Sequence, residues 1–98
     1  MKRNPQTIEK VRRQLSEALA GVEGYLNNWS KATLDFTTEA ELHIFATKLL
    51  EMRESLDKDE IVPILGFWRI METWPYKNDI RQKIVEAEYE YERLNKRG

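Results

Sequence analysis

The chain has 98 residues, 41% of them hydrophobic, with 16 Lys and Arg against 17 Asp and Glu and no Cys. This length suits one domain (1–98) with a modest core and is too short for a Rossmann, TIM-barrel or kinase fold. The composition excludes disulfides, Cys-ligated zinc and thiol chemistry, no apolar run reaches the roughly 18 residues that a membrane span needs, and a net charge of −1 argues against a strongly basic nucleic-acid binder.

The first helix is expected over about 4–29. Asn4 can cap it, and Pro5 suits the first helical position. Gly21 and Gly24 lie off its apolar seam, and each permits a bend, admits a close neighbour or is a tolerated surface glycine. The seam repeats at spacings of three and four residues and consists of Ile8, Val11, Leu15, Ala18, Val22, Tyr25 and Trp29.

A second helix is expected over about 38–56, after a loop at 30–37 that is polar except for Leu34 and Phe36. Thr38 and Glu41 fit a capping box, in which each side chain bonds the other residue's backbone amide. The apolar seam of this helix consists of Leu42, Phe45, Leu49, Met52 and Leu56.

Two further helices are expected over about 59–74 and 78–95. The 59–74 segment is apolar nearly all round, which is typical of a central helix or an interface, and Pro63 makes a short fifth helix or turn near Lys58–Val62 an alternative. In the last helix, Asp79 and Gln82 resemble a capping arrangement. Its seam consists of Ile80, Ile84, Ala87, Tyr91 and Leu94.

No strand pattern occurs, and short connections favour antiparallel packing of successive helices. The sequence therefore predicts an all-α fold, a compact antiparallel four-helix bundle.

Catalytic and metal chemistry lack their usual residues. His43 is the single histidine, and Glu39 four residues earlier supplies only one more ligand where zinc needs about four. No Gly-rich loop could hold a phosphate. The serines lack a recognisable nucleophile motif. We therefore expect no enzyme activity, no metal and no cofactor.

Two charge patterns have alternative interpretations. Residues 1–33 carry six Lys or Arg and three Glu, but the charges are interleaved and no helix-turn-helix follows, so a solvated surface is favoured over nucleic-acid binding. The run at 86–92 places like charges four residues apart, as in Glu88 and Glu92. It is either a surface for a basic partner or, as we favour, a charged solvent face.

Aromatic residues give the strongest functional indication. Trp29, Trp68 and Trp74 are best interpreted as core residues of a small bundle. By contrast, Phe36 and Tyr76 lie with Leu34 outside the expected helices, where apolar side chains often contact a partner.

Three pieces of the chain resemble a helical family that includes the N-terminal domain of elongation factor TFIIS and the integrase-binding domain of lens epithelium-derived growth factor. The pieces are Leu34-Asp35, the Leu49–Leu56 end of the second helix, and Trp74-Pro-Tyr-Lys77 with the helix that follows. The resemblance spans about 8–95. This chain departs from the family in its longer second helix and in lacking the family's terminal Trp.

The resemblance implies a transcription-associated scaffold that binds short disordered acidic-aromatic peptides between the two loops. Leu34 would then make an apolar contact and Asp35 would accept hydrogen bonds. Tyr76, with Trp74 beside it, would wall an aromatic pocket, and Lys77 would attract acidic residues.

The leading hypothesis is thus a non-catalytic helical module that binds a protein or peptide partner through Leu34, Asp35, Phe36, Trp74, Tyr76 and Lys77. The alternative is a small bacterial or phage protein of immunity or inhibitor type, with its interface along a helix face. It could act as a homodimer that buries the 59–74 helix. The expected location is intracellular and soluble: nuclear under the resemblance, otherwise cytoplasmic.

Overall fold

The computed structural model describes residues 5–29, 34–58, 60 and 72–97, of which 96 and 97 are described by their backbone alone. Most of these residues form three helices: α1 (Pro5–Asn27), α2 (Glu39–Lys58) and α4 (Asp79–Arg97). The described ranges contain no strand. The all-helical class is therefore confirmed, together with three of the four predicted helices.

The predicted helix at 59–74 falls mostly outside the described residues. Of its length, only residues 60 and 72–74 are described, and none of these four is helical. The alternative, a short helix or turn near Lys58–Val62, also falls mostly outside the described residues. Lys58 itself is the last residue of α2. The four-helix architecture accordingly remains a prediction.

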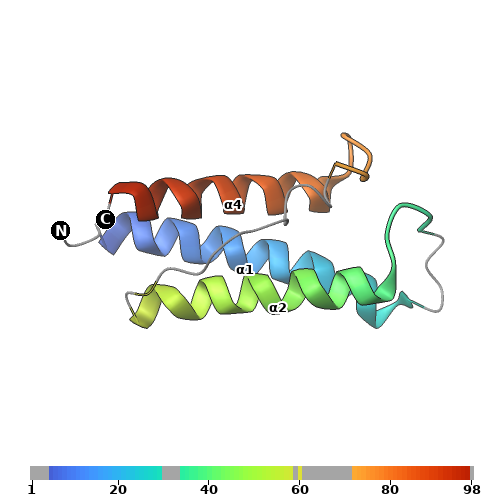
Figure 1. Ribbon diagram of the computed structural model, residues 1–98, viewed down its shortest axis with the longest axis horizontal. Coiled ribbons are helices and arrows are strands. Elements are labelled where there is room, and N and C mark those ends of the chain that lie inside the picture. The colour runs from blue at the N-terminus through green and yellow to red at the C-terminus, as the bar shows by residue number, and fades with distance from the viewer. Residues whose placement is uncertain (1–4, 30–33, 59, 61–71, 98) are drawn as a thin grey trace.

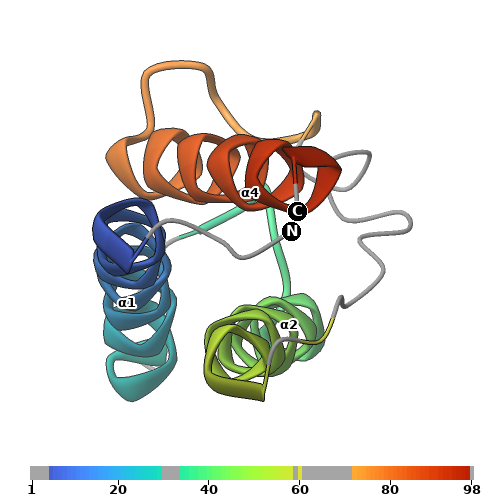
Figure 2. The same cartoon turned by 90° about the vertical axis from the view of Figure 1, so that its left-hand side faces the viewer.

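The long axes of the three helices lie roughly along one direction, in a molecule of 45 × 22 × 20 Å (Figure 1). α1 runs opposite to both α2 and α4, so the predicted antiparallel packing of the first two helices is confirmed. α2 and α4 both begin where α1 ends, and we call this the loop end of the molecule. Seen along the bundle, α1 and α2 lie beneath α4 (Figure 2).

The predicted seams form the core. α1 packs against both other helices, because its apolar stripe is wide enough to face two neighbours. Ile8, Tyr25, Trp29 and Ile80 lie at the core's margin and are partly buried. The buried seam residues of the three helices are Val11, Leu15, Ala18, Val22, Leu42, Phe45, Leu49, Met52, Leu56, Ile84, Ala87, Tyr91 and Leu94.

A buried hydrogen bond joins α2 to α4. Ser55 Oγ donates to the carbonyl oxygen of Met52 at 2.6 Å, and the Tyr91 hydroxyl lies 2.5 Å from the same Ser55 oxygen. Either hydroxyl can be the donor in this second contact. This pair satisfies two polar groups that would otherwise be costly inside an apolar core.

An ion pair at the surface joins α1 to α2, beside a second ion pair within α1. Arg12 Nη1 is 2.7 Å from Asp57 Oδ1, and Arg12 Nε is 3.1 Å from Glu9 Oε1. The hydrogen bond to Asp57 raises the pKa of Arg12 above its ordinary value. Because both carboxylates are largely solvated, the contribution of these pairs to stability is small.

The two internal glycines of α1 differ in their surroundings. A Cβ at Gly21 would collide with the Ile80 side chain of α4, whereas a Cβ at Gly24 would meet nothing within 4 Å. Gly21 therefore permits the close approach of α4, and Gly24 is a surface glycine. The predicted close neighbour is therefore found at Gly21, and the predicted tolerated surface glycine is Gly24.

Replacing these glycines should separate the two roles. Gly24→Ala is expected to raise the free energy of unfolding by about 1 kcal/mol, because alanine favours the helix. Gly21→Ala gains the same propensity but forces Ile80 to move, so it should be clearly less stable than Gly24→Ala in urea denaturation. Adding Ile80→Val, which lacks the colliding Cδ1 atom, should narrow the gap. Equal stabilisation by both alanines would contradict this packing.

Candidate functional site

The 34–38 segment is held by the N-terminus of α2. The backbone amide of Glu41 donates to Thr38 Oγ1 at 3.1 Å, and the Thr38 amide donates to Glu41 Oε1 at 3.2 Å. The predicted capping box is therefore confirmed. Thr37 Oγ1 adds a third bond to Glu41 Oε1 at 3.1 Å, so the residues that directly follow Phe36 are fixed to the helix.

The 72–78 segment is held in the same way by the start of α4. Asn78 Oδ1 accepts from the Arg81 amide at 2.8 Å, which makes Asn78 the helix cap. The capping arrangement predicted from Asp79 and Gln82 is wrong, because Asp79 is already helical and Gln82 Nε2 instead donates to the Tyr76 carbonyl at 2.9 Å. These bonds fix the turn that carries Tyr76.

Asn78 also ties this turn to α1. Its Nδ2 donates to the Tyr25 hydroxyl at 2.9 Å, and its backbone amide donates to the Pro75 carbonyl at 3.0 Å. A single side chain thus caps α4 and links it to the last part of α1.

The two segments meet at Phe36 and Trp74. Their ring centroids are 4.8 Å apart at an interplanar angle of 62°, an edge-to-face contact. Thr73 Oγ1 donates to the Phe36 carbonyl at 3.5 Å, at the limit of a hydrogen bond. Trp74 also contacts Phe45 of α2 at 5.7 Å and Tyr25 of α1 at 6.1 Å, centroid to centroid. Segments nearly 40 residues apart in the chain therefore form one surface at the loop end (Figure 1).

The six residues of the predicted binding site occupy different depths. Trp74 is 2% exposed, so its interpretation as a core residue is confirmed and its ring lies beneath the surface. Leu34 and Phe36 are half-buried, while Asp35 and Lys77 are exposed.

Tyr76 is the exposed aromatic residue of this surface. Its side chain is 77% exposed, and the guanidinium carbon of Arg81 lies 4.7 Å from its ring centroid. A cation over one ring face restrains the tyrosine without burying it. A fixed turn thereby presents a large, pre-positioned aromatic side chain to solvent.

The acidic run on α4 is not uniformly solvated. Glu86 and Glu92 are exposed, but Glu88 is 6% exposed and its Oε2 atom has no hydrogen-bond partner among the described residues. Burial, together with the charge of Glu92, raises the pKa of Glu88 to about 7. The favoured interpretation of a charged solvent face is therefore wrong for Glu88. The sequence did contain a signal for its burial. Glu88 lies four residues after Ile84 and three before Tyr91, both core residues, and this spacing places it on the buried face of α4.

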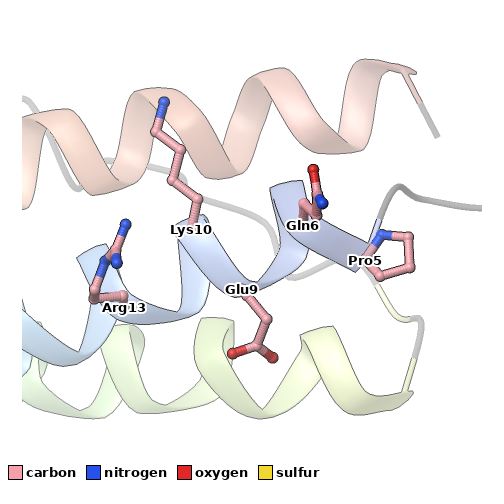
Figure 3. Close-up of a pocket in the computed structure, with 5 residues that line it drawn as sticks. All are labelled: Pro5, Gln6, Glu9, Lys10 and Arg13. Atoms are coloured by element: carbon pink, nitrogen blue, oxygen red, sulfur yellow. The ribbon is translucent and has the colours of Figure 1, made fainter.

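Three other surface features offer less. A shallow pocket on the first turns of α1 is lined by Pro5, Gln6, Glu9, Lys10 and Arg13, and in Figure 3 the Lys10 and Glu9 side chains point to opposite sides. On α2, Ile44 lines a shallow depression beside His43, and Leu50 is also exposed. Single exposed apolar residues of this kind are ordinary.

The part of the chain that the structure describes contains no group of three His, Asp or Glu side chains placed to hold a metal ion. None of its helices combines the length and apolarity that crossing a membrane requires. The feature that stands out is thus the surface formed by the two loop segments.

Trp74 variants test how this surface is held together. Trp74→Ala is expected to lower the free energy of unfolding by about 3–5 kcal/mol. Trp74→Phe should cost clearly less, because the Trp74 Nε1 atom is buried without a partner among the described residues, so phenylalanine loses volume but no hydrogen bond. Chemical denaturation measures both variants. Equal losses for Phe and Ala would show that ring packing is not what Trp74 contributes.

Glu88 should give the stability a specific pH dependence. Because its pKa is raised to about 7, the folded state holds a proton that the unfolded state releases, so stability falls as pH rises from about 4.5 to 7 and then levels. Glu88→Gln should remove this loss of stability. At pH 8 its free energy of unfolding should be roughly 1–3 kcal/mol higher than that of the original chain. Denaturation at pH 5 and pH 8 measures it, with exposed Glu86→Gln as the control. A gain that is the same at both pH values would contradict the raised pKa.

No family model matches the chain, and searches of curated proteins and of solved structures found no match either.

Proposed function

We propose that this protein is a non-catalytic interaction module that binds a segment of a partner protein at its loop end. The observation that carries the proposal is the contact of Phe36 with Trp74, which joins two loop segments into one surface. Loops held on a rigid scaffold are common places for binding residues. Here each of the two segments is fixed by its own helix cap.

The exposed Tyr76 supports binding over a purely structural role. Tyrosine is frequent among the residues that dominate interface energies, since it offers a large contact area and loses little conformational entropy. Tyr76 has already lost part of that entropy, because its carbonyl is bonded to Gln82 and its ring is covered on one face by Arg81. An ordered anchor of this kind lowers the cost of association.

The chemistry of the neighbouring residues suits a peptide. Asp35 can accept hydrogen bonds from backbone amides, and Lys77 can attract a carboxylate. Leu34 and Phe36 are half-buried and supply an apolar border. The resemblance implies these same roles for Leu34, Asp35 and Lys77. Affinity should be modest, because a disordered segment becomes ordered when it binds.

An amide-resolved NMR titration tests the proposal. The probe is an acidic peptide that contains Phe-x-Gly-Phe, added to the isotopically labelled chain. Shifts are expected at Asp35, Phe36, Tyr76 and Lys77, and the Tyr76→Ala variant should bind at least tenfold more weakly, because its aromatic anchor is gone.

Tyr89 provides a matched control, since it is also an exposed tyrosine, at 62%, but lies on α4 outside the two segments. Tyr89→Ala should bind the peptide like the original chain. Shifts that follow a helix face instead, or an equal loss for both tyrosine variants, would place the interface elsewhere.

A further inference from the structure

We infer that the loop-end surface selects a segment of mixed charge, in which an apolar or aromatic residue lies between a basic residue on one side and an acidic residue on the other. This inference rests on the proposed function and names the chemistry of the partner. It differs from the acidic-aromatic peptide that the resemblance implies, because it adds a basic residue on one side.

One edge of the surface is acidic. The contact between Phe36 and Thr73 joins the two segments. Asp35 directly precedes Phe36, and Glu72 directly precedes Thr73. Both carboxylates belong to exposed residues, and neither forms an ion pair with another described residue. Two carboxylates that have no ion-pair partner among the described residues therefore adjoin the same junction, where an incoming cation would interact favourably with both.

The other edge, around Tyr76, carries two positive charges, Lys77 and Arg81, against the exposed carboxylate of Asp79. Lys77 is exposed and likewise forms no ion pair with a described residue. It follows Tyr76, whose ring carries the Arg81 guanidinium 4.7 Å from its centroid. Positive charge thus adjoins the exposed tyrosine, where an acidic side chain would interact favourably.

The apolar part of the surface lies between these edges in chain order. Trp74 is buried beneath it, Pro75 is exposed, and Tyr76 is the most exposed aromatic residue described. Even a fully extended chain between Glu72 and Lys77 spans at most about 18 Å. A bound segment of about six residues can therefore reach both edges at once.

Opposite charges at the two edges make a uniformly charged segment a poor fit. An all-acidic segment interacts favourably near Lys77 but is repelled near Asp35 and Glu72. An all-basic segment interacts favourably near the two carboxylates but is repelled near Lys77. Exposed ion pairs are weak individually, so the expected preference is modest, about fivefold in affinity for a mixed segment. It should shrink as salt shortens the range of the interaction below roughly 10 Å.

The test uses four blocked peptides built around Gly-Phe-Gly-Phe-Gly. Two carry a Lys pair on one side and a Glu pair on the other, in the two possible orders. The third carries Glu pairs on both sides and the fourth carries Lys pairs. NMR titration at low salt gives each dissociation constant, and the better mixed peptide should bind about fivefold more tightly than either uniform one.

Charge-reversal variants at exposed positions should change this ranking without disturbing the core. Asp35→Lys combined with Glu72→Lys should move the preference to the all-Glu peptide, and Lys77→Glu should move it to the all-Lys peptide. Glu54→Lys, an exposed residue near the far end of α2, is the control and should leave the ranking unchanged.

The two ways of failing are distinguishable. If the peptides bind at Phe36 and Tyr76 but the all-Glu peptide binds as tightly as the mixed ones, the inference is overturned and the proposed function stands. If no peptide shifts the amides around Phe36 and Tyr76, the proposed function fails at this surface and the inference fails with it.

Discussion

The packing of Trp74 is the interaction on which the loop end depends. Its ring contacts Tyr25 from α1, Phe36 from the 34–38 segment and Phe45 from α2. A buried tryptophan removes roughly 150–250 Å² from water. No other described aromatic residue joins all these segments.

The burial of Trp74 fixes the position of the exposed residues that follow it in the chain. Pro75 and Tyr76 directly follow this buried residue, and Asn78, two residues after Tyr76, caps α4. The surface is therefore an outcome of core packing, and its shape is set before any partner arrives. This distinguishes it from Ile44 and Leu50 on α2, which are exposed apolar side chains on a regular helix and need no special arrangement around them.

Much of this fold could be predicted from the sequence, and the parts that could not have separate causes. The three-and-four spacing of apolar residues identifies the buried face of each helix, and the capping box at Thr38 is local, so both were predictable. Periodicity does not tell which helix faces which, so the approach of Ile80 to Gly21 needed the tertiary structure. The burial of Glu88 did have a signal, its spacing from the core residues Ile84 and Tyr91. The choice of Asn78 over Asp79 as the cap turns on a one-residue difference that local patterns do not resolve.

The composite origin of the loop-end surface links binding to folding. The Phe36 and Trp74 segments come together only when α1, α2 and the start of α4 are all in place, so the unfolded chain offers no equivalent of this surface. A ligand that binds only the folded form raises its stability by RT ln(1 + [L]/Kd), which is about 2.7 kcal/mol at a hundredfold excess over Kd. A ligand that contacts only a few exposed residues at one end would thus raise the free energy of unfolding of the whole bundle.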